Sequence, residues 1–591
     1  MDKQITSENI FEHQLHEHDH HLHPEPKTFL SKYVFSYDHK VIAKQFLWFG
    51  IAWAFIGALM SIMIRWCLAY PGEPFPIIGQ LLFPHTDGVI APDVYNMLFT
   101  LHGTIMIFFA ITPILIGAFG NLIIPLMIGA RDMLFPWLNM LSFWLTFIGG
   151  VLMFASFFVP LGGSAVGWTS YPTLAHSQWS PGMGHSLWLL SLFFIGNSSI
   201  VGAINYISTV IRLRAPGMTW SRLPLSIWGL FLAAVLNALF IPVLTAAFIL
   251  LLIDRTFGTT FFLAAAISEK GSLGDPILYQ HLFWIFGHPE VYIVILPAWG
   301  FVSDFLSFFA RKPAFGAKWT AGSLIAICVL SAVVYGHHMF TTGMSPLLTG
   351  AFTTLTLMIS IPSGIFFLNW LGTIWRGRLQ LNTTMWFSIG VVITFGIGGL
   401  TGLHLGAVSS NILLHNTYFV VGHFHLTMAV AALLGAYAAV YFWFPKMFGR
   451  MLSERLGKIH FWFTLLPILV IFCGMFFAGY AGMHRRIYNP YEYTYLQHLL
   501  SLNKMISWAA ATVFYAQFLF MFNFVKSMYW GEKAGANPWK VGTLEWTIPS
   551  PPVHYNFEEI PVVNHGPHEF SNPKVKNKDW VGQTEPADVL A

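Results

Sequence analysis

At residues 415–425 the chain reads His-Asn-Thr-Tyr-Phe-Val-Val-Gly-His-Phe-His, and an apolar run continues from there to residue 446. A run of this length predicts a helix that crosses a membrane. Each residue of an α-helix advances about 100°, so His423 and His425, two positions apart, point in nearly opposite directions. One helix could therefore hold two metal centres, one on each side.

Composition places the whole chain in a membrane. Of its 591 residues, 55% are hydrophobic and 9% are charged, whereas soluble domains carry roughly 25% charged residues. Basic runs with interleaved aromatic residues are absent, which argues against nucleic-acid binding. The three cysteines, Cys67, Cys328 and Cys473, form no C-x-x-C pair, so we expect neither disulfides nor a thiolate metal site in this chain.

Twelve apolar runs are long enough to span a bilayer, which predicts an all-α, polytopic membrane protein with twelve transmembrane helices. They are 46–66, 97–126, 137–161, 186–213, 225–254, 277–310, 319–340, 346–375, 383–404, 416–446, 457–483 and 504–530. We expect three regions: a disordered, histidine-rich extension (1–30), the twelve-helix core (31–533) and a C-terminal extension (534–591). Lysine and arginine gather before the first run and in alternate loops, so both termini are predicted to be cytoplasmic.

Histidines inside apolar runs are expensive to bury and usually functional. His102 suits an axial haem ligand, and pairing with one of the histidines at 423 and 425 would give a six-coordinate haem that only transfers electrons. His288 and Tyr292 are four residues apart and share a helical face. Glu290 points away from that face and is a candidate proton relay.

The pair His337 and His338 lies in another apolar run. Together with His288, these residues could form a three-histidine site with an open position, which suits copper. Facing a five-coordinate haem iron, such a copper ion would make a two-metal pocket for a small diatomic ligand.

These motifs resemble the catalytic subunit I of the haem–copper oxygen reductases, the terminal oxidases of respiratory chains. The resemblance covers roughly residues 30–530 and rests on His-Pro-Glu-Val-Tyr at 288–292, on the pair at 337–338 and on His-Phe-His at 423–425. It implies a low-spin haem on His102 and His425, a high-spin haem on His423, and copper on His288, His337 and His338. It also implies that Tyr292 is cross-linked to His288 and supplies an electron and a proton when the O–O bond breaks.

The resemblance further implies a proton-uptake route from Asp132 to Glu290. The polar residues that would order its water molecules are Asn121, Asn139, Asn205, Ser198 and Ser199. A second route is in doubt, because Phe366 stands where many relatives place its anchoring lysine. Either that route starts elsewhere, or more protons enter through the Asp132 channel.

On the opposite side, Arg485 and Arg486 resemble the pair that binds haem propionates. His415 resembles a ligand of a magnesium site, although Asn416 stands where an aspartate is common. Arg65 resembles the arginine beside a ring substituent of the low-spin haem.

The resemblance thus implies an enzyme that reduces oxygen to water and pumps protons, with two A-type haems and one copper. Expected partners are a subunit II that receives electrons, further small oxidase subunits, and cytochrome c or quinol as donor, in a bacterial inner membrane. Two alternatives remain open: a nitric oxide reductase of the same superfamily, and an electron-transfer cytochrome without substrate chemistry. Iron without copper would favour the first, and a haem that does not bind carbon monoxide would favour the second.

Overall fold

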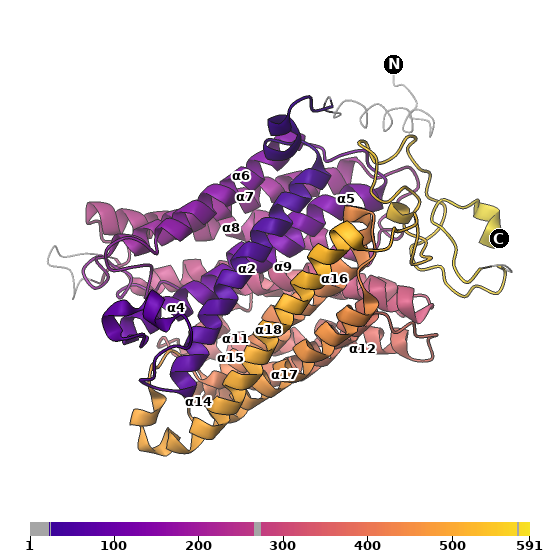
Figure 1. The fold of residues 1–591 in the computed structure, drawn as a ribbon. Coiled ribbons are helices and arrows are strands. Elements are labelled where there is room, and N and C mark those ends of the chain that lie inside the picture. Colours follow the sequence, from indigo (N-terminus) through magenta and orange to yellow (C-terminus); the bar gives the residue numbers. More distant parts are fainter. Residues whose placement is uncertain (1–22, 24, 265–273, 576–577, 591) are drawn as a thin grey trace.

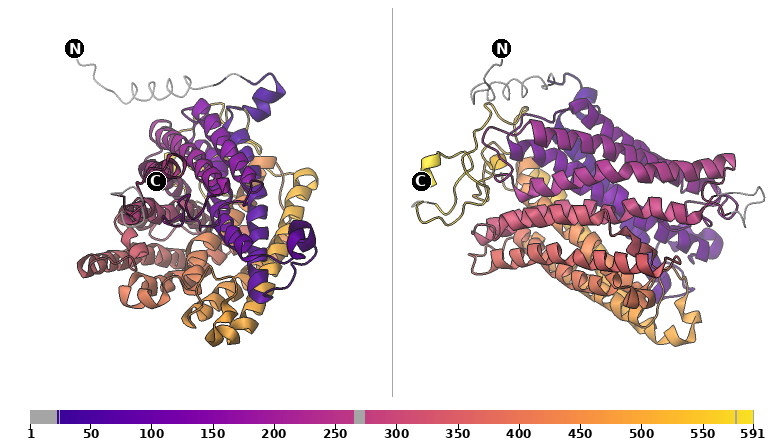
Figure 2. Two further views of the ribbon diagram at one scale, coloured as in Figure 1. Left: turned by 90° about the vertical axis from the view of Figure 1, so that its left-hand side faces the viewer. Right: turned by 180° about the vertical axis from the view of Figure 1, so that it is seen from behind.

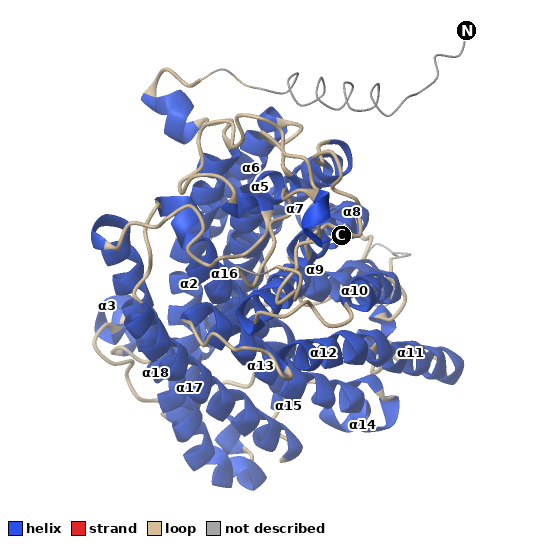
Figure 3. Cartoon of the chain, turned by 90° about the vertical axis from the view of Figure 1, so that its right-hand side faces the viewer, coloured by secondary structure: helices blue, strands red, loops and turns tan. Residues whose placement is uncertain are grey.

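The computed structural model describes residues 23, 25–264, 274–575 and 578–590, and these residues form helices joined by loops, without a β-strand (Figures 1 and 3). Most of the histidine-rich extension expected at residues 1–30 lies outside the described residues. The main helices are α2 (His39–Ala69), α4 (Pro92–Thr104), α5 (Asn121–Ile128), α6 (Pro136–Ala155), α7 (Met183–Arg212), α8 (Leu225–Phe257), α9 (Pro276–Ala310), α10 (Ala317–Ser331), α11 (Pro346–Met358), α12 (Ser360–Ile374), α13 (Thr383–Gly406), α14 (Val408–Leu414), α15 (Tyr418–Phe424), α16 (Val430–Phe448), α17 (Glu454–Tyr480) and α18 (Leu500–Trp530).

Within the described ranges, eleven helices are long and apolar enough to cross a membrane. They match eleven of the twelve predicted runs and confirm an all-α, polytopic membrane protein. The run at 319–340 differs from the prediction, because its helix α10 has 15 residues and ends at Ser331. A short 3₁₀ helix, η5 (Tyr335–Met339), follows and carries the two adjacent histidines.

Two spans form the centre of the bundle. The middle of α9 is entirely buried, and the span Pro92–Ile128 is almost entirely buried. The other spans pack around them and run side by side along the molecule (Figure 2). Apolar side chains exposed on the outer spans suit the hydrocarbon interior of a bilayer.

Local π-helical turns occur in two spans beside histidines of interest. One turn, η3 (Ile105–Ile111), follows α4 shortly after His102. Another, η6 (His425–Ala429), begins at His425 itself and separates α15 from α16. Such turns are often found at functional sites, because they re-aim neighbouring side chains.

The C-terminal extension packs on one end of the bundle, the end at which α2 begins (Figure 1, yellow). Asp579 binds both Nε and Nη2 of Arg311, just beyond α9, at 2.9 and 2.5 Å. Nζ of Lys446, near the end of α16, donates to the carbonyl oxygen of Ile548 at 2.6 Å. The extension is therefore a folded layer on the helices.

Candidate metal and haem cavity

One cavity of about 1470 Å³ brings together the residues that the sequence singled out for metals, cofactors and chemistry. A typical ligand pocket measures about 300–1,000 Å³, so this one has room for large groups. The predicted residues that line it are Arg65, His102, His288, Glu290, Tyr292, His337, His338, His415, Asn416, His423, His425, Arg485 and Arg486.

Three imidazoles converge in this cavity. One nitrogen from each of His288, His337 and His338 lies within 4.8 Å of the others. Nδ1 of His288 is 3.4 Å from Nε2 of His338, so two ring nitrogens face each other. Among the described residues, this is the one group of three or more histidine, cysteine or carboxylate side chains close enough to share an ion.

Neighbouring residues orient these imidazoles. Nδ1 of His337 donates to Oγ1 of Thr356 at 3.1 Å, because that hydroxyl itself donates to the carbonyl oxygen of Phe352. This bond leaves Nε2 of His337 with a lone pair for a metal, the usual arrangement for a histidine ligand. The ring of His338 stacks on Trp284, with centroids 3.8 Å apart and planes 5° from parallel.

Tyr292 lies beside the ring of His288, with centroids 5.0 Å apart. Nε2 of His288 is buried and makes no hydrogen bond within the part of the chain that the structure describes. A buried nitrogen without a partner is costly, so this atom fits a bond to a neighbouring group.

The three other histidines share one feature: Nδ1 of each donates to a backbone carbonyl oxygen. The acceptors are Gly57 for His102, Gly398 for His423 and Val421 for His425, at 2.8, 3.1 and 2.9 Å. With Nδ1 protonated, Nε2 carries the lone pair that can bind iron.

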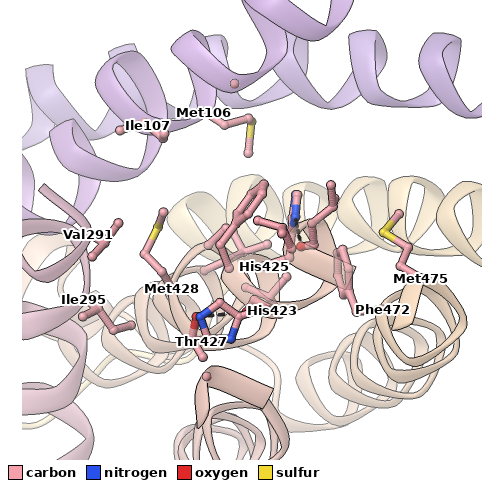
Figure 4. A pocket seen from close by; sticks show the side chains of 18 of the residues that line it. Met106, Ile107, Val291, Ile295, His423, His425, Thr427, Met428, Phe472 and Met475 are labelled. Carbon is pink, nitrogen blue, oxygen red and sulfur yellow. Dashed lines mark hydrogen bonds between the residues drawn. The ribbon is translucent and has the colours of Figure 1, made fainter. Parts of the chain in front are cut away.

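His423 and His425 contact different helices, as the sequence spacing predicted (Figure 4). Nδ1 of His423 also lies 3.0 Å from the hydroxyl of Thr401, on α13. The ring of His425 instead stacks on Phe472, on α17, at 4.6 Å. One helix therefore presents imidazoles to two separate parts of the cavity.

Glu290 is 2% exposed and reaches the cavity from α9. Its Oε2 atom has no hydrogen-bond partner among the residues described. A carboxyl group in this situation can exchange a proton with water or with a group inside the cavity.

The residues predicted for the proton route lie outside this cavity, on neighbouring helices. Asn121 begins α5, Asn139 lies on α6, and α7 carries Ser198, Ser199 and Asn205. Within the described ranges, four buried amide atoms of the three asparagines have no hydrogen-bond partner: Oδ1 of Asn121, both atoms of Asn139 and Nδ2 of Asn205. Buried polar atoms of this kind are commonly satisfied by internal water.

Two further residues of this region escaped the sequence analysis. The hydroxyl of Ser198 donates to the carbonyl oxygen of Ser142 at 2.6 Å and lies 2.8 Å from the hydroxyl of Thr146. Ser142 and Thr146 are four residues apart and share a face of α6 with Asn139. This spacing could have identified them from the sequence.

Asp132 is buried at the end of the bundle covered by the C-terminal extension. Its Oδ1 accepts from the backbone nitrogen of Met133 at 2.6 Å, and its Oδ2 lies 2.9 Å from Nε2 of His23. His23 belongs to the predicted extension 1–30, and its contact with a residue of the predicted route was not expected.

The arginine pair lies between α17 and α18. Burial and the neighbouring Arg486 lower the pKa of Arg485 to about 9. Nε and Nη2 of Arg485 both donate to Oδ1 of Asn416, at 3.2 and 2.8 Å. Two adjacent, partly buried guanidinium groups favour an anion.

The same contacts do not fit the expected magnesium site. Oδ1 of Asn416 is the oxygen that a cation would use, and both of its lone pairs accept from the guanidinium group of Arg485. Nδ1 of His415 lies 3.1 Å from Oδ1 of Asn411. We therefore assign no magnesium to His415 and Asn416.

Arg65 on α2 is 6% exposed. Its Nη2 donates to the carbonyl oxygen and to Oδ1 of Asn503, at 3.0 and 2.8 Å. Nη1 has no hydrogen-bond partner in the described part of the chain, and the residue lines the cavity. It can therefore donate to an oxygen atom of a bound group.

Comparison with known proteins decides the family. The family model described as "Cytochrome C and Quinol oxidase polypeptide I" matches residues 41–517. The chain belongs to this family. It is therefore a haem- and copper-type oxidoreductase subunit that crosses the membrane several times and works in a multi-subunit complex.

Relatives of this oxidase family align over nearly their whole length. "Alternative cytochrome c oxidase subunit 1" of Bradyrhizobium diazoefficiens is 42% identical over 573 residues, which are 95% of this chain and 94% of that protein. "Cytochrome c oxidase subunit 1" of Synechocystis sp. is 43% identical over 549 residues, 93% and 94% of the two chains.

A solved structure shares the oxidase fold. It is titled "Cryo-EM structure of a heme-copper terminal oxidase dimer" and aligns with a TM-score of 0.70 at 20% identity, covering 84% of this chain and 85% of that one. At this identity, the likeness supports the fold alone.

Proposed function

We propose that this subunit reduces dioxygen to water in the cavity described above, with protons delivered through Asp132 and Glu290. Each O₂ takes up four electrons and four protons and yields two water molecules. Part of the energy drives further protons across the membrane. The oxidase family and the chemistry of the donor groups support this proposal.

The observation that carries it is the three-histidine group beside Tyr292. Neutral imidazoles with an open position suit copper. Among the described residues, no aspartate or glutamate completes this group, whereas the iron site of a nitric oxide reductase would need added carboxylates. Nε2 of His288, buried beside the ring of Tyr292, fits the cross-link between the two side chains.

Two haems fit the remaining imidazoles. His102 and His425 would hold the low-spin haem, and His423 would hold the high-spin one, each through Nε2. Nη1 of Arg65 would donate to an oxygen on the low-spin ring, as an A-type haem would offer. Arg485 and Arg486 would bind propionates. When bound, the high-spin haem and copper would supply oxygen binding and electron transfer to it.

The chain's own residues handle the protons. Tyr292 would give up a phenolic proton and an electron when the O–O bond breaks, and would regain both later. Glu290 would take protons from the water-filled route and release them in the cavity. Ser198, together with the three asparagines that have unpartnered atoms, would hold the water molecules in place.

Relatives named as cytochrome c oxidase subunits favour cytochrome c as the electron donor. Because this chain has no cysteine–histidine cluster suited to electron entry, a second subunit would receive the electrons. We place the complex in a bacterial inner membrane with both termini in the cytoplasm, since lysine and arginine gather on that side.

Metal analysis and gas binding test this function on the purified complex. We expect one copper for every two haems, one haem that binds carbon monoxide, and oxygen consumption with reduced cytochrome c. Iron without copper would indicate a nitric oxide reductase. A carbon monoxide difference spectrum without a signal would indicate an electron-transfer cytochrome.

A further inference from the structure

The loop that carries Asp132 is held by the C-terminal extension. The chain leaves α5 at Gly129, where φ is +81°. Pro561 and Leu544 approach so closely that a β-carbon on Gly129 would lie 3.0 Å from Cγ of Pro561 and 3.2 Å from Cδ1 of Leu544. The first residue of the loop is thus packed against the extension.

The next two residues of the loop are also bound by the extension. Nη2 of Arg131 donates to the carbonyl oxygen of Glu558 at 2.9 Å. Nδ2 of Asn556 donates to the carbonyl oxygens of Ala130 and Arg131, at 3.1 and 3.0 Å. Three consecutive residues before Asp132 therefore contact a segment more than 400 positions later in the chain.

Asn556 also binds the start of α2. Its Oδ1 accepts from Nζ of Lys40 at 3.2 Å. Nδ1 of His39 donates to the carbonyl oxygen of Asn121 at 2.7 Å, so Nε2 of the neutral ring accepts from Nδ2 of Asn556 at 2.9 Å. One amide group thus joins the loop before Asp132 to the helix turn at Asn121.

This connection is buried and conformationally specific. Asn556 is 1% exposed, and His39 and Asn121 are fully buried. Asn556 has a φ of +63°, a left-handed conformation that asparagine adopts more readily than most residues. The two hydrogens of its NH₂ group are shared among three acceptors, the carbonyl oxygens of Ala130 and Arg131 and Nε2 of His39. A similar side chain without the NH₂ group would therefore lose the contacts to the loop.

We propose that Asn556 is a positioning residue for proton uptake, holding Asp132 in register with Asn121. This inference rests on the proposed function of Asp132. Hydrogen bonds weaken outside a narrow range of distances and angles, and Asn556 would fix the spacing at the first step of the route. The C-terminal extension is then a working part of the proton inlet.

Several titratable and charged groups face the inlet and bear on its pH dependence. They are His23, Asp38, His39, Lys40, Arg131, Asp132 and His554.

The experiment replaces Asn556 in the complete complex with glycine, which accepts a positive φ without strain. Proton uptake from the solvent is followed with a pH-indicator dye after carbon monoxide is photolysed from the reduced complex in the presence of oxygen. For Asn556→Gly we expect uptake slower by about tenfold, since small misplacements of this kind have large rate effects. The slowing should lessen as the pH is lowered, because proton supply has become limiting.

Asn564→Gly is the matched control. Asn564 lies in the same extension, and its Nδ2 donates to the carbonyl oxygen of Glu585, away from the loop. This variant should take up protons at the normal rate. Both variants should keep normal haem spectra and carbon monoxide binding, which a general loss of structure would change.

Asn556→Asp keeps the size and the oxygen atom but loses the NH₂ donors, and it should also slow uptake. Normal uptake by Asn556→Gly, or equal slowing in Asn564→Gly, would overturn the proposal. Failure of both Asn556 variants to load haem and copper would also overturn it, by assigning Asn556 to assembly. Asp132→Asn distinguishes a failure of this inference from a failure of the proposed function. If this variant takes up protons normally, the proposed route through Asp132 is wrong.

Discussion

At the scale of single residues, Glu290 combines deep burial with an oxygen that has no partner in the described part of the chain. It shares α9 with His288 and Tyr292, so one helix carries the proposed copper ligand, a phenol and a carboxyl group. If the proposed function is correct, protons that reach Glu290 arrive within one helical turn of the place where oxygen is reduced.

Replacing Glu290 with glutamine should lower oxygen consumption by about a hundredfold, the range expected when a positioned acid–base group is lost. The amide keeps the shape but cannot carry the proton. The measurement is the steady-state oxygen consumption of the purified complex. Glu290→Asp keeps a carboxyl group and should retain much more activity, and normal turnover by Glu290→Gln would remove this residue from the route.

Arg65→Met should shift the visible absorption band of the low-spin haem, because the donor Nη1 near the ring would be lost. The band of the haem that binds carbon monoxide should not move. Difference spectra of the reduced complex, with and without carbon monoxide, separate the two bands. An unshifted low-spin band would place Arg65 away from the ring.

At the scale of helices, α9, α12 and α13 meet in an aromatic cluster where the second proton route of many relatives would run. Phe366 is fully buried, and its ring lies 4.6 Å from that of Trp299 and 5.5 Å from that of Phe395. Trp370 packs on its edge at 4.9 Å. Trp299 and Phe395 also line the cavity, but the apolar ring of Phe366 cannot carry a proton. We therefore expect little proton entry along this path.

Asp132→Asn should therefore lower turnover by about a hundredfold, since proton transfer through one route then serves every step. Phe366→Ala is its counterpart: it should destabilise the protein by about 3–5 kcal/mol but change turnover less than twofold. Oxygen consumption and thermal unfolding of the two variants provide the measurements. Near-normal turnover by Asp132→Asn would show that protons enter elsewhere.

The helices and most cavity residues were predictable, because a bilayer makes long apolar runs and buried histidines stand out from the sequence. The break between α10 and η5 was not. His337 and His338 lie in η5, after α10 has ended at Ser331, and hydrophobicity does not reveal that end. Asn416 contacts Arg485, which lies 69 positions later in the chain. The spacing of residues around His415 could not reveal this contact, so it could not show that the magnesium expectation fails.

At the scale of the whole molecule, the C-terminal extension is held by groups with opposite pH responses. The hydrogen bond from Arg311 lowers the pKa of Asp579 from its ordinary value. Burial raises the pKa of Glu545 to about 7. A carboxyl group whose pKa is lowered by folding stabilises the folded state at a pH above its ordinary pKa, and this stabilisation is lost as the pH falls. A carboxyl group whose pKa is raised by folding destabilises the folded state as the pH rises above its ordinary pKa.

We therefore expect docking of the extension to be strongest at about pH 4–4.5, above the ordinary pKa of Asp579 and below that of Glu545. It should weaken below pH 4 as Asp579 takes up a proton, and Glu545 should weaken it by about 3 kcal/mol between pH 4.5 and 7, following the linkage between pKa and stability. Hydrogen exchange of residues 543–575 as a function of pH provides the measurement. Glu545→Gln should remove the upper part of this dependence, and an unchanged profile would contradict the assignment.

The contact between Asn556 and Ala130 also sets an order of events during biosynthesis. These residues are 426 positions apart, and the ribosome makes the loop long before it makes the asparagine that fastens it. A chain that ended at residue 533 would contain every cavity residue but would lack the hydrogen bonds from Asn556 to the loop before Asp132. On the proposal made above, the ribosome must pass Asn556 before the inlet can take up protons at its full rate.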